Sequence, residues 1–172
     1  PVEKGKLLLG EWKNIFFISA LILFIGQSCT DDTLYMKTYK FENNQWQQNV
    51  KPTFKLSFPG DTITYDVIFT LRSTVDYAYN NIWLYITTSG PQCKELPESK
   101  SIIGRSPVEI KMAKANGEWI GSKSGTYIDH KLLFRQRRFC KGDYSFKVEQ
   151  AVTIGTLDEL SDLTIEVKPT IW

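Results

Sequence analysis

Cys29 is the residue of this chain whose surroundings point most directly to a chemical reaction. An uncharged, largely apolar run from Ile15 to Ile25 precedes it, and the small residues Gly26 and Ser28 stand just before it. A thiol in this position is the acyl acceptor when a bacterial lipoprotein is processed. We therefore expect Cys29 to be lipidated and to become the first residue of the mature chain.

The apolar run before Cys29 is too short to cross a membrane. Its 11 residues would make a helix of about 16 Å, whereas a bilayer core is about 30 Å thick. This length is typical of the hydrophobic region of a signal peptide. We expect residues 1–28 to be a lipoprotein signal peptide and residues 29–37 a lipidated tether, which anchors stably if Cys29 carries more than one acyl chain. An ordinary secretory signal with a chance cysteine is the alternative.

The chain has two further cysteines, Cys93 and Cys140. In an oxidising compartment an even pair suggests a disulfide. This bond would close a loop of about 48 residues and would stabilise the fold by roughly 4 kcal/mol in the chain-entropy model. Two buried free thiols are the alternative.

His130 is the only histidine, so any Ser–His or Cys–His nucleophile would have to use it. Its strand-like surroundings contain no nucleophile elbow, which favours an exposed or hydrogen-bonded strand residue over a catalytic one. Zinc sites draw on several His and Cys ligands, and the chain has no glycine-rich phosphate loop. We expect no catalytic role for His130, no metal and no cofactor.

Acidic and basic side chains offer weaker signals. No spacing pairs the carboxylates that glycoside hydrolysis would need, and we expect solvated positions for Asp61, Asp66, Asp76, Glu109 and Glu118. One basic cluster could meet lipid phosphates, glycans or an acidic partner, or could be a solvated strand face that blocks aggregation. It comprises Arg135, Arg137, Arg138 and Lys141, interleaved with Phe134 and Phe139.

The charge balance excludes one class of partner. The whole chain has 21 basic and 19 acidic residues, and removal of residues 1–28 leaves 18 and 17. A nucleic-acid-binding domain normally shows a strongly basic patch, so we expect no nucleic-acid partner.

Three tryptophans could stack on sugars, namely Trp46, Trp83 and Trp119. Most aromatic residues in a fold of this size, however, belong to the core.

Apolar and polar residues alternate with period two along most of the chain after the tether. This pattern predicts an all-β fold, a single antiparallel β-sandwich of about eight strands over residues 38–172, of jelly-roll or immunoglobulin-like type. The expected strands are Tyr39–Phe41, Phe54–Phe58, Tyr65–Leu71, Ile82–Thr87, Val108–Lys114, Glu118–Ile120, Tyr127–Phe134, Tyr144–Val148 and Leu163–Val167. The segment Leu157–Leu163 could form a helical turn.

Three local signals refine this expectation. Ile82–Thr87 is apolar on both faces, which indicates a central strand covered on both sides. Asn116-Gly117 predicts a hairpin with a type I′ turn. Gly142-Asp143-Tyr144 is similar to the entry of a late sandwich strand, where a tyrosine hydroxyl bonds to nearby backbone in a tyrosine corner.

Several blocks of sequence together resemble a known family. They are Phe41–Trp46, Asp76–Tyr85, Asn116–Gly121 and Lys141–Ala151. In this order, behind a lipoprotein signal, they resemble the GldH gliding-motility lipoproteins of Bacteroidota over residues 15–168. The resemblance implies an envelope lipoprotein without enzyme activity, tied to the gliding apparatus that works alongside the type IX secretion system. Cys29 is the one functional residue that it carries over.

The leading hypothesis is therefore a lipid-anchored, non-catalytic outer-membrane protein that acts by protein–protein contact. Its partners would be envelope proteins of a motility or secretion complex, together with the membrane through the lipid anchor. Strand edges and the Asp76–Asn81 loop are the expected contact surfaces, because loops on a rigid scaffold commonly carry function. A glycan-binding surface lipoprotein is the alternative.

Overall fold

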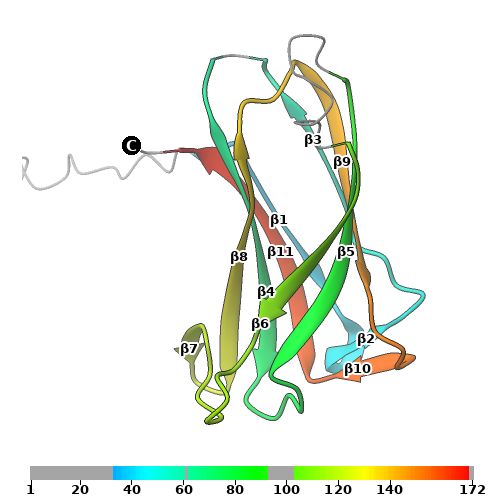
Figure 1. The fold of residues 1–172 in the computed structure, drawn as a ribbon, viewed down its shortest axis with the longest axis vertical. Helices are drawn as coiled ribbons and strands as arrows, with labels where there is room; N and C mark the ends of the chain where they lie inside the picture. The colour runs from blue at the N-terminus through cyan, green and yellow to red at the C-terminus, as the bar shows by residue number, and fades with distance from the viewer. Residues whose placement is uncertain (1–32, 61, 93–102, 171–172) are drawn as a thin grey trace, which may run out of the picture. The chain divides into compact units, whose positions relative to one another are not determined.

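The computed structural model describes residues 33–60, 62–92 and 103–170, and in it two antiparallel sheets pack face to face (Figure 1). The five-stranded sheet has the order β1-β11-β4-β8-β7 and the four-stranded sheet the order β3-β9-β5-β6, while β10 and β2 pair separately. The strands are β1 (Tyr35–Lys40), β2 (Gln45–Gln47), β3 (Thr53–Phe58), β4 (Tyr65–Thr74), β5 (Asn81–Ser89), β6 (Gly104–Lys111), β7 (Ser122–Ser124), β8 (Tyr127–Arg137), β9 (Gly142–Gln150), β10 (Thr156–Asp158) and β11 (Leu160–Pro169), and a 3-10 turn covers Glu42–Asn44.

The antiparallel β-sandwich predicted from the alternation is confirmed, with a different strand count. The described residues form eleven strands, of which β2, β7 and β10 have three residues each. A strand of three residues shows too little alternation to be recognised in a sequence. In the described part of the chain, no helix is long and apolar enough to cross a membrane.

Aromatic side chains from both sheets meet in the core. Phe69 of β4 lies with its ring centroid 6.2 Å from Phe54 of β3 and 6.4 Å from Phe146 of β9, in the opposite sheet. It also packs edge-on against Phe134 of β8 at 5.8 Å. All four rings are buried. Edge-to-face pairs of this kind stabilise a core beyond the burial of their area.

β5 is an interior strand, as predicted, but only one of its faces is covered. It pairs with β6 and β9, and Ile82, Leu84 and Ile86 point into the core. Trp83, between the first two of these, keeps 46% of its surface exposed. The expectation of cover on both sides was wrong, because no layer packs against the outer face of this sheet among the described residues.

The hairpin at Asn116-Gly117 forms with a different turn. The amide of Gly117 donates to the carbonyl of Lys114 at 3.0 Å, which places Ala115 and Asn116 at the two central positions. Only Gly117 has a positive φ, +84°, so the turn is not type I′. The return strand Glu118–Ile120 is reduced to one bridge, between Ala113 and Trp119. The segment Leu157–Leu163 lies in β10 and β11, with Glu159 as the one residue between them, and is not helical.

The tyrosine corner is confirmed. A backbone hydrogen bond from Cys140, four residues upstream, reaches the hydroxyl of Tyr144 at the start of β9. The same hydroxyl also lies 3.4 Å from the carbonyl oxygen of Pro91. Tyr144 thereby connects the turn before β9 to the chain that leaves β5.

Different strand termini and loops lie at the two ends of the sandwich. At one end, here called the tether end, β1 begins at Tyr35 opposite Val167, and β8 finishes with Arg137. At the other, the distal end, β1 finishes at Lys40 opposite Asp162, and the 75–80 loop joins β4 to β5. Figure 1 shows the 75–80 loop and the β2–β10 pair at the same end.

Trp46 closes the core at the distal end. It is fully buried in β2, opposite Leu157 of β10. Its indole stacks on Phe41 at 4.7 Å, and its ring N–H donates to the carbonyl of Val50 at 2.9 Å. The indole therefore fixes the short β2–β10 pair to the rest of the sandwich.

Replacement of Trp46 by alanine is expected to lower the free energy of unfolding by about 3–5 kcal/mol, because it leaves a large cavity and removes a hydrogen bond. Urea unfolding followed by circular dichroism measures the change. Trp83→Ala is the matched control, since its side chain is half exposed, and it is expected to shift stability by no more than about 0.5 kcal/mol. Equal losses in the two variants would contradict this assignment.

Candidate functional site

Only one of the three candidate sugar-stacking tryptophans is available to a ligand. Trp46 is fully buried, and Trp119 is half-buried against the core with its ring centroid 6.2 Å from that of His130. Trp83 points outward from β5. The prediction that most tryptophans belong to the core is therefore correct for two of the three.

His130 is buried and hydrogen-bonded at both ring nitrogens. Its Nδ1 lies 2.5 Å from the carbonyl oxygen of Ile120, which only an N–H can bond. Nε2 is then the acceptor of the Ser73 hydroxyl, at 3.0 Å. A serine whose hydroxyl bonds a histidine resembles an activated nucleophile, but both side chains are almost completely inaccessible to solvent. This pair fixes β4, β8 and the loop before β7 to one another.

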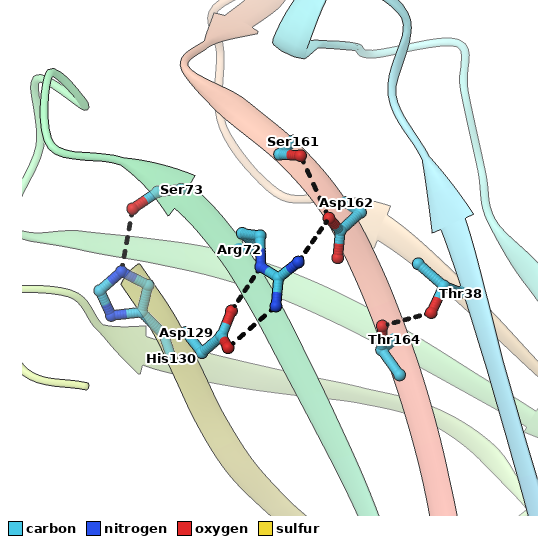
Figure 2. A network of polar contacts seen from close by, with 8 residues as sticks. All are labelled: Thr38, Arg72, Ser73, Asp129, His130, Ser161, Asp162 and Thr164. Atoms are coloured by element: carbon cyan, nitrogen blue, oxygen red, sulfur yellow. Dashed lines mark hydrogen bonds and ion pairs between the residues drawn. The ribbon is translucent and has the colours of Figure 1, made fainter. Parts of the chain in front are cut away.

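An ionic network that the sequence did not indicate crosses the outer face of the five-stranded sheet (Figure 2). Arg72 of β4 donates to both carboxylate oxygens of Asp129 of β8, at 2.7 and 3.0 Å. On its other side it lies 3.8 Å from Asp162 of β11. The hydroxyls of Thr38 and Thr164 join β1 to β11 at 2.7 Å. Together these contacts connect four strands.

Arg72 lowers the pKa of the Asp129 carboxyl, chiefly through this hydrogen bond, although burial opposes it. The contribution of Asp129 to stability is therefore complete above the ordinary carboxyl pKa of about 3.9 and is lost as the pH falls below it. No local sequence motif could reveal this network, because Arg72 and Asp129 are 57 residues apart. Only the register of β4 against β8 brings them together.

The carboxylates considered for glycoside hydrolysis have separate surroundings where the structure describes them. Asp66 accepts hydrogen bonds from Gln136 and Thr170, and Glu118 pairs with Lys114 at 2.9 Å. Asp76 is exposed, and Asp61 lies outside the described residues. Among the described residues no group of three or more His, Cys, Asp or Glu side chains could hold a metal ion.

The basic cluster does not form one solvated strand face. A bulge near Leu133 breaks the alternation of β8, so Phe134 is buried while Arg135 folds over its ring at 4.1 Å. Arg135 donates to Ser106 of β6 at 3.0 Å, and burial lowers the pKa of its guanidinium. Arg138 and Lys141 are exposed at the tether end. The expectation of a single face was wrong because of this bulge.

The two predicted sites at cysteine residues lie at the edge of the described chain or outside it. Cys29 and Cys93 are outside the described residues, whereas Cys140 lies in the turn before β9. Pro91, two residues before Cys93, packs closely on Gly142. A Cβ atom on residue 142 would lie 2.9 Å from the Cγ atom of Pro91. This proximity supports our proposal that Cys93 and Cys140 form a disulfide.

A cluster on the outer face of the four-stranded sheet has the composition of a binding surface. At the distal end, Asn81 of β5 stands opposite Lys111 of β6, and Trp83 stands opposite Glu109. The amide of Asn81 donates to Glu109 at 2.7 Å. A hollow of about 330 Å³ lies beside Trp83 and is lined by Asn80, Asn81, Glu109, Lys111, Ala113, Lys114, Ala115 and Ile120. We call Asn81, Trp83, Glu109 and Lys111 the distal corner.

Toward the tether end of the same face, the carboxylate of Glu149 is surrounded by basic side chains. Glu149 of β9 pairs with Lys51 at 2.7 Å, and Arg105 lies 3.8 Å away. Lys51, by its hydrogen bond, is the main cause of the lowered pKa of Glu149. Arg105 also covers the ring of Tyr85, with its guanidinium carbon 3.6 Å from the ring centroid. Glu149 is thus paired with cations, including Lys147 at 3.7 Å.

Burial lowers the pKa of His130 below its ordinary value. Below about pH 6.5 the unfolded chain therefore binds a proton that the folded chain resists, so the free energy of unfolding is expected to fall as the pH drops from about 6.5. Because the chain has one histidine, His130→Gln should flatten this slope while lowering stability at pH 7.5. Denaturant unfolding across this range measures both, and an unchanged slope in the variant would refute the assignment.

A disulfide between Cys93 and Cys140 is expected to appear as one linked peptide in a non-reducing proteolytic map analysed by mass spectrometry. Reduction, or Cys140→Ser, should lower the free energy of unfolding by roughly 4 kcal/mol, because the unfolded chain gains entropy when the loop opens. Alkylation of both thiols in the unreduced, denatured protein would count against the pairing.

Comparison with known proteins places this fold in a family. The family model described as GldH lipoprotein matches residues 33–167. The chain is 28% identical over 150 residues to the "Gliding motility lipoprotein GldH homolog" of Christiangramia forsetii, covering 86% of this chain and 85% of that protein. It is 25% identical over 139 residues to the "Gliding motility lipoprotein GldH" of Flavobacterium johnsoniae, covering 81% and 80%. No solved structure matches significantly. The chain belongs to the GldH lipoprotein family.

Proposed function

We propose that this GldH-family lipoprotein is held at the outer membrane by acylated Cys29 and acts without catalysis, through contact with envelope proteins of the gliding and type IX secretion machinery. The observation that carries the proposal is the family match over residues 33–167, with two relatives named for gliding motility. A lipoprotein of this family is membrane-anchored.

The layout of the sandwich suits a protein that is anchored at one end. β1 starts at Tyr35, six residues after Cys29, and six residues span at most about 20 Å when fully extended. The chain thus enters the sandwich at the tether end. The 75–80 loop lies at the other end of the strands, where it is available to other proteins.

The 75–80 loop has a shape suited to contact. Tyr77 is buried and serves as its internal support, and burial raises the pKa of its hydroxyl. Tyr79 packs edge-on against it with ring centroids 5.6 Å apart and keeps 46% of its surface exposed. A supported, exposed tyrosine is a frequent hot spot of protein interfaces. The loop is therefore our candidate for the partner-binding surface.

Two features support a role without catalysis. The Ser73–His130 pair is buried on both sides and offers no route to a substrate. The candidate carboxylates in the described part of the chain are bonded to neighbouring side chains or exposed to solvent. Neither arrangement places a base beside an accessible reacting group, as general acid–base catalysis requires.

Site-specific photocrosslinking tests the proposed contact. A photoreactive phenylalanine analogue at position 79 is expected to capture envelope proteins in intact cells, whereas the same analogue at exposed position 141, at the tether end, should capture few of them. Mass spectrometry identifies the products. Failure to recover any motility or secretion component at position 79 would count heavily against the proposed function.

The anchor requires its own measurement. Mass spectrometry of the mature N-terminus is expected to show Cys29 as the first residue, carrying more than one acyl chain, and membrane fractionation is expected to place the protein with the outer membrane. Cys29→Ser should release the protein from that fraction. An unmodified Cys29 would overturn the anchoring proposal but would leave the sandwich unaffected.

A further inference from the structure

We propose that the distal corner is a saccharide-binding site, in which Trp83 stacks on the apolar face of a pyranose ring and Asn81, Glu109 and Lys111 bind its hydroxyl groups. This inference is independent of the proposed protein contact, because it rests on the outer face of β5 and β6 and not on the family or the anchor.

The register defines the corner as a compact array. Asn81 and Trp83 are two residues apart on β5, and Lys111 and Glu109 are their direct partners on β6. Side chains directly opposite each other in an antiparallel pair have Cβ atoms about 5 Å apart. Ile82 and Ile110, between them, are buried, which confirms that the four side chains share the outer face. An aromatic surface and three polar groups thus lie within the span of one sugar ring.

The indole of Trp83 is free to accept a ligand. Its neighbour on the β9 side is Ala151, whose amide donates to the carbonyl of Trp83 at 2.8 Å and whose side chain is small. Tyr85, the next aromatic residue outward on the same strand, is covered by Arg105. Among the aromatic residues described on this face, Trp83 is therefore the one that offers an open ring.

The polar groups of the corner are prepared for hydroxyl groups. The Asn81–Glu109 hydrogen bond of 2.7 Å fixes the orientation of the amide and the carboxylate. Glu109 and Lys111 form no ion pair within 4.0 Å in the described part of the chain, whereas Glu149 on the same face is paired. Adjacent hydroxyls need both donors and acceptors, and an amide, a carboxylate and an ammonium group supply them.

The size and polarity of the hollow favour a saccharide over a protein side chain. Its volume of about 330 Å³ is at the lower end of the range for small-ligand sites. The core of a protein interface is depleted of charge, whereas this hollow has Glu109, Lys111 and Lys114 in its lining beside the apolar Ala113, Ala115 and Ile120. Trp83 lies next to this hollow, opposite Glu109 on the sheet face, so its indole would meet the apolar face of a ring whose polar edge reaches into the hollow.

A glycan array that includes plant, bacterial and host oligosaccharides tests the site, with the full chain in detergent as the probe. The wild type is expected to bind at least one class of pyranose oligosaccharide. Trp83→Ala should weaken that binding by about tenfold or more, as expected for loss of an aromatic stack. Glu109→Gln should also weaken it, because a carboxylate accepts more strongly than an amide.

Leu133→Ala is the matched control, since Leu133 is 54% exposed on the five-stranded sheet. It should bind like the wild type, and all variants should keep the wild-type unfolding midpoint. No binding by the wild type, or full binding by Trp83→Ala, would overturn the site. Crosslinking at position 79 reports on the protein contact separately, so failure of one proposal is distinguishable from failure of the other.

Discussion

The two sheets share one layer of core side chains, and this packing determines which residues face solvent. Phe69 lies in that layer and contacts rings from both sheets. Because side chains alternate along a strand, each residue committed to this layer places its neighbours on the outside. Burial of Ile82 and Leu84 therefore places Trp83 in solvent. The exposed indole is a geometric consequence of the core, and its neighbours on β6 are fixed by the same register.

The charged side chains on the two outer faces of the sandwich are paired differently. On the five-stranded sheet, Arg72 is held between Asp129 and Asp162, and these charges are satisfied within the face. On the four-stranded sheet, Glu149 gathers its cations around it, yet at the distal corner Glu109 and Lys111 stay apart. A charge that already has a partner has little to gain from a ligand, because binding would first have to break that pair. Glu109 and Lys111 of the distal corner therefore have more to gain from a ligand than Arg72 or Glu149.

The sequence predicted those features that depend on the local alternation of apolar and polar residues or on a short motif. The long strands β3, β4, β8, β9 and β11 each include a segment expected from period two, β5 includes one expected from its apolar run, and the tyrosine corner at Tyr144 followed from its spacing. Features that depend on register were not predictable. The Arg72–Asp129 pair requires knowledge of how β4 lies against β8, and the bulge in β8 turns Arg135 away from the face that alternation assigns to it. The apolar appearance of Ile82–Thr87 was misleading, because an exposed tryptophan looks like a core residue in a sequence.

The distal corner and the 75–80 loop form one continuous structure. The carbonyl of Asn80, the last residue of that loop, accepts hydrogen bonds from the amides of Met112 at 2.8 Å and Ala113 at 3.0 Å. These bonds attach the loop to the chain that leaves β6 after Lys111. Tyr79 is two residues from Asn81, so the loop and the corner lie at the same end of the sandwich. Because these bonds hold the loop against β6, the two candidate surfaces belong to one rigid end of the fold, although each rests on its own side chains.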